Sequence, residues 1–462
     1  MSRRYQAPQF LTSPSFESLL EFVQESHPES FADFERELRE RVSAFESELL
    51  AEKLESYDVD TPMVRIDGVG YRRKHRSKGR YCGISGEFEI ERTMYVPRGG
   101  GRSVCPLELR AGIVEGYFTP RAGLVSAQAV ALGTPKEAHE LFVELGGMRP
   151  STSSLDRLPK HLSEKWEQKR EEFESELREQ EVVPAESCAV AISIDGVHVP
   201  MKESGRAEKR RAEGRRPQGP AGFREVGCGT VTLLDGEGAR QATVRYGRKP
   251  EKNKSVVKAQ VEAELASILA VRPDLTVVAL ADGARENWEF FRGVGERLGI
   301  EVIEAVDFYH VCERLKAAFD ACYGEQSAES KSRFERFRVL LEEKSDGVER
   351  VIRALNARRD KLTGWRRKTV EAQLRYFRRY RHKMPYKELR DRDLPIGSGV
   401  VEAACKTLAS SRLKRSGMAW GLEGVQAILT LRSLMQSGRW VAGWNLLATE
   451  YTAEIQPLES AA

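Results

Sequence analysis

The chain has 462 residues, of which 40% are hydrophobic and 31% charged, so it can bury the cores of several domains beneath a highly charged surface. Lys and Arg number 74 against 70 Asp and Glu; the net charge is only +4, but the basic residues are clustered and favour an anionic partner met by local patches. No apolar run approaches the roughly 18 residues of a membrane span, and the first residues lack a secretory apolar segment, so we expect a soluble cytoplasmic protein without a membrane partner.

The N-terminal part is predicted to begin with a helical segment and a small β module. In residues 1–60, apolar side chains recur at helical spacing with Pro28 as a break, which suits either internal packing or dimerisation. Residues 61–118 alternate like strands and contain the basic run 72–80. This run either contacts nucleic acid or forms a charged loop.

A helix-turn-helix is the next expected feature, within residues 119–185. Thr134 is suited to cap a helix that has Pro135 at its first position, and a second helix starts within 148–162. Two brief helices joined by a short turn suit a DNA groove, although ordinary helical hairpins share the pattern. The charged stretch 162–182 is predicted to be a linker or coiled-coil helix.

Residues 186–307 change to an α/β pattern. Three adjacent strands, followed by alternating helix and strand, predict a mixed sheet with flanking helices, the pattern of a ribonuclease H-like (RNase H-like) core. The basic segment 202–222 is expected to be mobile. The expected strands are 189–199, 223–234, 239–247, 275–283 and 300–307, with helices at 252–270 and 284–299.

An all-helical insertion is predicted for residues 308–392. Residues 393–450 then complete the catalytic core, and 451–462 form a C-terminal tail. The end of the insertion, from 365 to 392, is rich in Lys, Arg and aromatic residues. Such a surface neutralises phosphates and stacks on unpaired bases, or it is a solvated face over an aromatic core seam.

Three acids stand in settings typical of a phosphoryl-transfer site. Asp195 and Asp282 each end an apolar run, and Glu402 lies near the start of a helix-like segment. Two divalent ions about 3.5–4 Å apart activate water and support the leaving oxygen, and carboxylates on rigid strand ends can hold them. A lone Asp before Gly is usually a turn residue, but the ordered trio is more specific. The helical insertion accounts for the long spacing before Glu402.

Six segments together resemble the ISKra-type insertion-sequence transposases, which are related to the Mutator-like DDE transposases with an RNase H-like fold. The resemblance covers residues 186–445 well and the N-terminal part more loosely. It implies that Asp195, Asp282 and Glu402 are the DDE ligands of two Mg²⁺ (or Mn²⁺) ions per active site. The segments are SIDGVHV, LADGA, DFYHVCERL, GSGVVEAACK, SSRLKRSGMAW and ILTLRSL.

The resemblance also implies a role for Asp307 and His310, which match the family's Asp-x-x-His signature after the fifth strand. His310 would then contact DNA near the scissile phosphate or orient a neighbour in the catalytic site. The alternative is a helix-capping Asp307 with a packed His310.

Basic residues after Glu402 and within the insertion are expected to bind DNA phosphates. Lys406 lies four residues after Glu402 on the same helix face, where an ion pair between the two is the competing interpretation. Trp420 is either a core residue or stacks on DNA. The predicted DNA-binding set is Arg366, Arg367, Lys368, Lys406, Arg412, Lys414 and Arg415.

The seven cysteines are scattered, odd in number and without a Cys-x-x-Cys pair, which indicates neither a disulfide framework nor a zinc ribbon and favours a reducing compartment. Relatives in the family often carry paired cysteines of a zinc-ribbon type in the N-terminal β module. Here Cys82 and Cys105 stand alone. We therefore expect no structural zinc.

These inferences predict a DNA transposase of a bacterial insertion sequence, acting on double-stranded DNA in the cytoplasm at the nucleoid. It would bind terminal inverted repeats, hydrolyse a strand at each end and join the freed 3′-hydroxyl to target DNA; both steps are in-line displacements at phosphorus. Holding two ends implies a homodimer or larger homo-oligomer. The alternatives are a metal-dependent nuclease that does not join strands and a domesticated, non-catalytic DNA-binding protein.

Overall fold

The chain divides into two compact units, and its C-terminal end belongs with its N-terminal part. The computed structural model describes residues 13–25, 28–202, 212–214 and 222–458. One unit contains residues 1–173 and 440–462, and the other contains residues 174–439. The sequence predicted instead that the core continues to residue 450.

The first unit combines helices with an antiparallel sheet of strand order β3-β2-β1-β9. Its strands are β1 (Met63–Ile66), β2 (Val69–Gly83), β3 (Gly86–Pro97) and β9 (Ile455–Leu458). Its helices are α1 (Pro14–Glu25), α2 (Phe31–Glu55), α3 (Pro106–Ala111), α4 (Pro120–Leu132), α5 (Pro135–Glu144), α6 (Thr152–Gln168) and α19 (Trp440–Thr449), and α7 (Arg170–Gln180) spans the boundary between the units.

The predicted C-terminal tail contains a strand of this sheet. β9 pairs with β1, where Ile455 lies opposite Ile66. The Glu454 backbone N–H also donates to the Asp67 carboxylate at 3.0 Å. Because β9 protects the edge of β1, the prediction of a simple tail at 451–462 is wrong: the end of the chain completes the N-terminal sheet.

Truncation tests this pairing. Ending the chain at Thr452 removes β9, so we expect faster proteolysis of β1 and its neighbours, because the edge of β1 loses its backbone partners. Ending the chain at Leu458 keeps β9 and is the matched control. Limited proteolysis followed by mass spectrometry measures the difference, and equal cleavage of the two truncated chains would contradict this account.

The basic run 72–80 is part of a strand rather than a loop. It lies within β2, and three of its cations pair with acids of β3 across the ladder. These pairs are exposed and add little stability, but they match much of the positive charge that suggested nucleic-acid contact. The pairs are Arg76–Glu91 at 3.7 Å, Lys78–Glu89 at 3.1 Å and Arg80–Glu87 at 4.0 Å.

The predicted helix-turn-helix segment forms helices α4 to α6. Thr134 and Glu137 make a reciprocal capping box at the start of α5: the Glu137 N–H donates to Thr134 Oγ1 at 3.1 Å, and the Thr134 N–H donates to Glu137 Oε2 at 2.7 Å. The single helix predicted for 162–182 is divided at Lys169 between α6 and α7. DNA reading by α5 and α6 stays a prediction.

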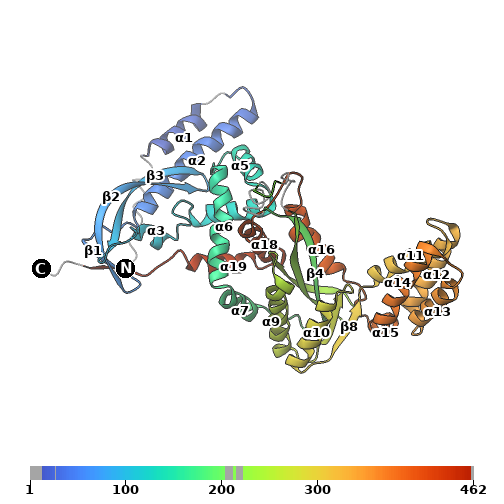
Figure 1. Cartoon of the computed structure of the whole chain (residues 1–462). Helices are drawn as coiled ribbons and strands as arrows, with labels where there is room; N and C mark the ends of the chain where they lie inside the picture. The colour runs from blue at the N-terminus through green and yellow to red at the C-terminus, as the bar shows by residue number, and fades with distance from the viewer. Residues whose placement is uncertain (1–12, 26–27, 203–211, 215–221, 459–462) are drawn as a thin grey trace. The chain divides into compact units, whose positions relative to one another are not determined.

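The second unit contains a five-stranded mixed sheet of order β6-β5-β4-β7-β8. β4, β5 and β6 are antiparallel, whereas β4, β7 and β8 are parallel. The predicted α/β class is therefore confirmed (Figure 1). The strands are β4 (Ser187–Pro200), β5 (Phe223–Asp235), β6 (Arg240–Arg248), β7 (Thr276–Ala281) and β8 (Val302–Val306). Most of the segment 202–222, predicted to be mobile, lies outside the described residues.

Helices α9 (Ser255–Val271) and α10 (Arg285–Leu298) belong to the core on one face of this sheet. Alternate β4 side chains, such as Ile192 and Ile194, enter that core. Gly229 of β5 permits the close approach of α9, since a Cβ there would lie 2.6 Å from the Val261 side chain. A short 3₁₀ turn, Lys252–Lys254, leads into α9.

The predicted insertion is helical throughout the described residues 308–392 apart from its turns. Its core is continuous with that of the sheet through Phe308, Val311 and Phe377. Its helices are α11 (Phe308–Tyr323), α12 (Ala328–Glu343), α13 (Gly347–Arg359), α14 (Gly364–Tyr380), the 3₁₀ turn Arg381–Lys383 and α15 (Tyr386–Asp391).

The last part of the second unit packs against the sheet, and its first helix changes from α-helical to π-helical hydrogen bonding. It consists of α16 (Gly399–Ala404), a π-helix (Cys405–Ser410), α17 (Ser411–Leu413) and α18 (Leu422–Gln436). α16 packs on β4 and β5, and α18 packs on β6. Among the described residues, the structure has no helix with the length and apolar character needed to cross a membrane.

Candidate active site

Asp195 and Asp282 lie at equivalent positions on two neighbouring parallel strands. Ser193 of β4 is in register with Leu280 of β7. Asp195, which lies within β4, and Asp282, which directly follows β7, each come two residues later, just past the last pair of the β4–β7 ladder. The register of the two strands therefore brings the two acids near each other, and the charge of Asp282 acts on Asp195.

Both acids also point to the same face of the sheet. Side chains two residues apart in a strand share a face. Ala191 of β4 and Leu280 of β7 belong to one apolar cluster, on the side away from α9 and α10. Asp195 is four residues after Ala191, and Asp282 is two residues after Leu280. Both acids are thus an even number of residues away along the chain, so they project from the face that α16 covers.

Glu402 reaches this face from α16. Cys405, three residues after Glu402, places its Sγ 3.6 Å from Asp195 Oδ2. Cys405 also packs with Val401 and with Cys228, the residue opposite Asp195 on β5. The helix that carries Glu402 is thus seated directly on Asp195, and this contact was not predicted from the sequence. The spacing of Cys405 from Glu402, close to one helical turn, was the available signal.

The carboxyls of Asp195 and Glu402 carry unfavourable negative charge. Burial raises the pKa of Asp195, and the charge of Asp282 raises it further, while hydrogen bonds from the Gly196 N–H and Cys405 act in the opposite direction. Burial also raises the pKa of Glu402, followed by the charges of Asp307 and Asp195. These shifts place the acids within electrostatic range of one another.

The raised pKa values predict a stability effect in metal-free buffer. A carboxyl whose pKa is higher in the folded state contributes stability below its unfolded pKa, and that contribution is lost as pH rises through the folded value. With EDTA present, Asp195→Asn and Glu402→Gln should therefore have higher melting temperatures than the wild type at pH 7. The difference should shrink as pH falls toward about 4. Thermal melting across pH measures it; wild-type melting equal to or above both variants at pH 7 would contradict the charge repulsion.

The donor set fits Mg²⁺ in chemistry, since it consists of carboxylate oxygens with uncompensated negative charge. The side chains are not arranged as ligands, however: no group of three or more His, Cys, Asp or Glu side chains within the described residues is placed to hold one ion. The backbone brings the three acids to one region. Two-ion binding by Asp195, Asp282 and Glu402 stays a prediction.

Asp307 has a structural position next to the acids. Ala281 is in register with Val306, so Asp307 follows β8 beside Asp282. Asp307 is buried and caps α11: its Oδ1 accepts the His310 N–H at 2.6 Å, and its Oδ2 accepts the Ser398 N–H. These contacts match the capping alternative, in which Asp307 anchors the segment that leads to α16, and a part of Asp307 in catalysis stays a prediction.

His310 lies half-buried near the acids. Its Nδ1 is 3.5 Å from Glu313 Oε2, and its ring meets Tyr376 of the insertion edge-on. His310 is close enough to Glu402 to affect the pKa of that carboxyl, in the lowering direction. Its side chain is thus near the site, whereas its predicted contact with DNA is untested.

The insertion is anchored on the turn that carries Asp282. Tyr380 Oη donates to the Gly283 carbonyl at 2.6 Å. A Cβ at Gly283 would lie 3.0 Å from the Tyr376 ring, so the absence of a side chain there permits the close approach of α14. Both tyrosines come from the basic, aromatic stretch singled out in the sequence, and these two belong to the packing seam rather than to an exposed surface.

The predicted DNA-binding residues fall into two groups. Arg412 is buried, and its guanidinium lies 5.0 Å from the centre of the Trp420 ring, so the prediction that it contacts DNA is wrong. Trp420 donates Nε1–H to the Leu413 carbonyl, as a packed residue does. The exposed or half-exposed members are Arg366, Arg367, Lys368, Lys406, Lys414 and Arg415. Among described residues, no ion pair joins Lys406 to Glu402.

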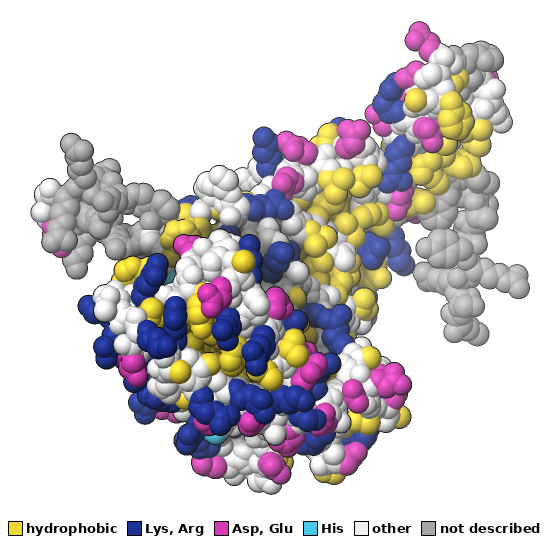
Figure 2. Space-filling model, turned by 90° about the vertical axis from the view of Figure 1, so that its right-hand side faces the viewer, with side chains coloured by type: hydrophobic (Ala, Val, Ile, Leu, Met, Phe, Trp, Pro, Cys, Tyr) yellow, Lys and Arg dark blue, Asp and Glu magenta, His cyan; other side chains and the backbone are white. Residues whose placement is uncertain are grey.

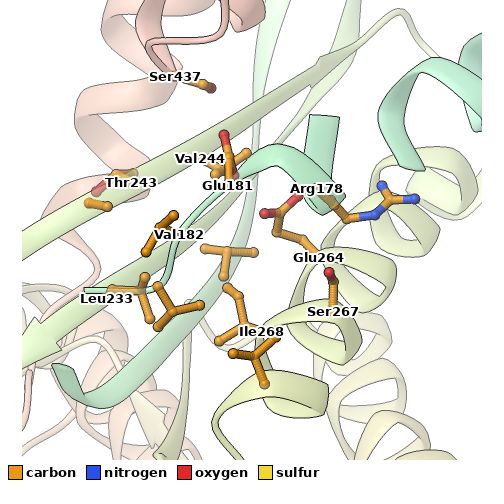
Figure 3. A pocket seen from close by; sticks show the side chains of 14 residues that line it. Arg178, Glu181, Val182, Leu233, Thr243, Val244, Glu264, Ser267, Ile268 and Ser437 are labelled. Carbon is orange, nitrogen blue, oxygen red and sulfur yellow. The ribbon is translucent and has the colours of Figure 1, made fainter. Parts of the chain in front are cut away.

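A cavity of about 240 Å³ lies elsewhere in the second unit, between α9 and strands β5 and β6 (Figure 3). Apolar side chains such as Leu233 and Ile268 line much of it, and Glu181 and Glu264 are at one side (Figure 3). None of the three site acids lines this cavity. It is therefore not part of the candidate active site.

Neither the protein-family models nor the curated proteins include a match to this chain.

Proposed function

We propose that the protein is a DNA transposase with an RNase H-like core, whose site contains Asp195, Asp282 and Glu402. One observation supports the proposal most: the backbone brings three acids that are far apart in sequence to one region of a mixed sheet, where burial and their charges raise the pKa values of Asp195 and Glu402. The strand order β6-β5-β4-β7-β8, with its first three strands antiparallel, supports the same fold.

Bound at this site, Mg²⁺ or Mn²⁺ would supply an activated water or hydroxyl and offset charge on the phosphate. The residues that would hold the ions are Asp195, Asp282 and Glu402. Strand β4 and the residue that follows β7 supply two of these acids from a rigid sheet, and α16 supplies the third. Asp307 holds the segment that precedes α16, so it positions Glu402 rather than touching the substrate.

The same arrangement can serve hydrolysis and strand transfer, since both are in-line displacements at phosphorus that differ only in the attacking oxygen. In the first, water attacks at the transposon end. In the second, the freed 3′-hydroxyl attacks target DNA. Asp282 and Glu402 are exposed, so exclusion of water before the second step would depend on the bound DNA.

An assay with two DNA substrates tests the proposal. Duplexes that carry the terminal repeats flanking the coding sequence should be cut when Mg²⁺ or Mn²⁺ is added, and pre-cut ends should be joined to a target plasmid. Cutting without joining would favour the nuclease alternative. Binding of the repeats without either reaction, in both metals, would favour the non-catalytic DNA-binding protein.

The proposal includes a phosphate-binding surface on the helical insertion. Lys and Arg side chains outnumber acids on the side of the molecule where α11 to α15 lie (Figure 2). Arg366, Arg367 and Lys368 are exposed in the first turns of α14, next to the exposed Trp365. Arg366 lies over the Trp365 ring at 5.7 Å, so a base that stacks on this ring would lie beside a cation.

Charge reversal of this surface should weaken DNA binding. Replacing Arg366 and Lys368 by Glu should lower affinity and reduce the slope of log affinity against log salt by about one for each phosphate that is no longer neutralised. Arg367 is left unchanged because it pairs with Glu371 at 3.0 Å. The matched control reverses Arg76 and Lys78, whose charges are already paired on β2. Fluorescence anisotropy at several salt concentrations measures both sets. A larger loss of affinity in the β2 variant would contradict the assignment.

A further inference from the structure

The helix that carries Glu402 contains a π-helical segment, and this segment is held by a buried arginine. The Ser411 N–H reaches the Lys406 carbonyl, five residues back, whereas the Lys414 N–H reaches the Ser410 carbonyl, four residues back. The register therefore changes between Glu402 and the basic residues that follow. π-helices are rare and occur often at functional sites.

Arg432 of α18 binds the carbonyls of the π-helix. Its Nε donates to the Leu408 carbonyl at 2.9 Å, and its Nη2 donates to the Thr407 carbonyl and to Ser411 Oγ. Only 7% of Arg432 is exposed. A buried guanidinium needs acceptors at fixed positions, so these bonds tie the π-helix to α18 in one geometry.

Thr407 and Gln436 complete the arrangement. Gln436 Nε2 donates to the Thr407 carbonyl at 3.1 Å, and its Oε1 lies 2.8 Å from Thr407 Oγ1. Thr407 Oγ1 also lies 2.7 Å from the Ala403 carbonyl, next to Glu402. A chain of hydrogen bonds therefore runs from α18 through the π-helix to the residue after Glu402.

The register matters because one residue corresponds to about 100° of rotation in a helix. If this segment were α-helical, the residues before it would turn by about that angle relative to the residues after it. Cys405 would leave Asp195 and Glu402 would leave the face that carries the acids.

We propose that Arg432, with Thr407 and Gln436, is a positioning residue that holds the π register and so directs the Glu402 carboxylate toward Asp195. The proposal deepens the proposed function and rests on it. Arg432 lies in ILTLRSL, a segment to which the proposed chemistry assigns no role.

A titration of Mn²⁺ binding to DNA-free protein tests the proposal directly. The electron paramagnetic resonance signal of free Mn²⁺ measures the binding. The half-saturation concentration should rise about tenfold or more in Arg432→Lys, because a lysine cannot reproduce the forked donors and loss of outer hydrogen bonds to a metal site typically costs 10–100-fold in affinity. Glu402→Gln gives the value expected for loss of a ligand.

Because Arg432→Lys could fold poorly, Thr407→Val provides a milder version. Thr407 is exposed, and valine keeps its shape while removing the hydroxyl that donates to the Ala403 carbonyl or to Gln436 Oε1. The Mn²⁺ half-saturation concentration of Thr407→Val should rise several-fold, and its melting temperature should not change. Thr369→Val in α14 is the matched control and should change neither quantity. DNA cleavage is measured in parallel with the same proteins.

The outcomes separate the two proposals. Wild-type Mn²⁺ binding retained in full by Thr407→Val and Arg432→Lys overturns the positioning role and leaves the transposase proposal standing. A second outcome is that the wild type binds Mn²⁺ without cutting DNA and that both variants bind Mn²⁺ more weakly than the wild type. This outcome supports the positioning role and contradicts the transposase proposal. A wild type that binds no Mn²⁺ overturns both.

Discussion

Asp195→Asn should abolish DNA cleavage and strand transfer while leaving binding of the terminal repeats intact. Asparagine keeps the shape of the side chain but removes the charge that a divalent ion requires. Metal-assisted charge stabilisation is worth several kcal/mol, and each 1.4 kcal/mol is tenfold in rate, so the cleavage rate should fall by roughly a thousandfold. Single-turnover cleavage of an end-labelled duplex measures the loss, and gel mobility measures binding.

Glu289→Gln is the matched control for that experiment. Glu289 is an exposed acid of α10 that pairs with Arg285 and stands apart from the site. The Glu289→Gln variant should cleave DNA at the wild-type rate. Cleavage by Asp195→Asn at a rate within a few-fold of this control would remove Asp195 from the catalytic site, and with it the metal assignment.

Arg439→Met should cause the largest loss of stability in the second unit. The Arg439 guanidinium is buried, pairs with Glu264 at 2.8 Å and with Glu181, and donates to Tyr246 Oη at 3.0 Å. Its removal leaves Glu264, which is 2% exposed, as a buried carboxylate without a cation. Breaking such a buried pair costs about 3–5 kcal/mol. Urea unfolding followed by circular dichroism measures the shift.

The double variant Arg439→Met with Glu264→Gln separates charge from packing. Because the unpaired charge is then gone, the double variant should be less destabilised than the sum of the single variants, with a coupling of about 0.5–3 kcal/mol. Additive losses would show that Arg439 stabilises the unit through packing alone. The cavity beside Glu264 is a further readout, since its lining should loosen in the single variant (Figure 3).

The sequence predicted those parts of the fold that depend on local pattern. The run ending at Asp195 is buried on both faces, and its apolar continuity indicates a central strand. The run ending at Asp282 behaves in the same way, and two parallel strands then align their ends. The proximity of Asp195 and Asp282 needs no long-range information beyond the adjacency of β4 and β7, whereas a shared metal site stays a prediction.

Features set by partners distant in sequence were not predictable. β9 is a four-residue strand with a proline, and only its pairing with β1 makes it a strand. The charges of the basic run 72–80 are matched by acids whose relevance appears once β2 and β3 are in register. Arg412 resembles a DNA-binding arginine in sequence, yet the packing of Trp420 encloses it.

Asp307 illustrates why a motif does not fix a role. The acid and His310 occur at the spacing of the family signature, and the structure explains that spacing by a cap in which Asp307 accepts the His310 N–H. The second bond, from the Ser398 N–H, links this cap to the segment before Glu402. The signature therefore connects two parts of the site through backbone contacts that the sequence does not display.

Anomalous scattering from a manganese-loaded crystal is the most direct measurement of whether one metal site unites the three acids. The account predicts Mn²⁺ density where the β4–β7 ladder ends, with oxygens of residues 195, 282 and 402 as ligands. A fully loaded crystal whose manganese peaks all lie away from these side chains would contradict it.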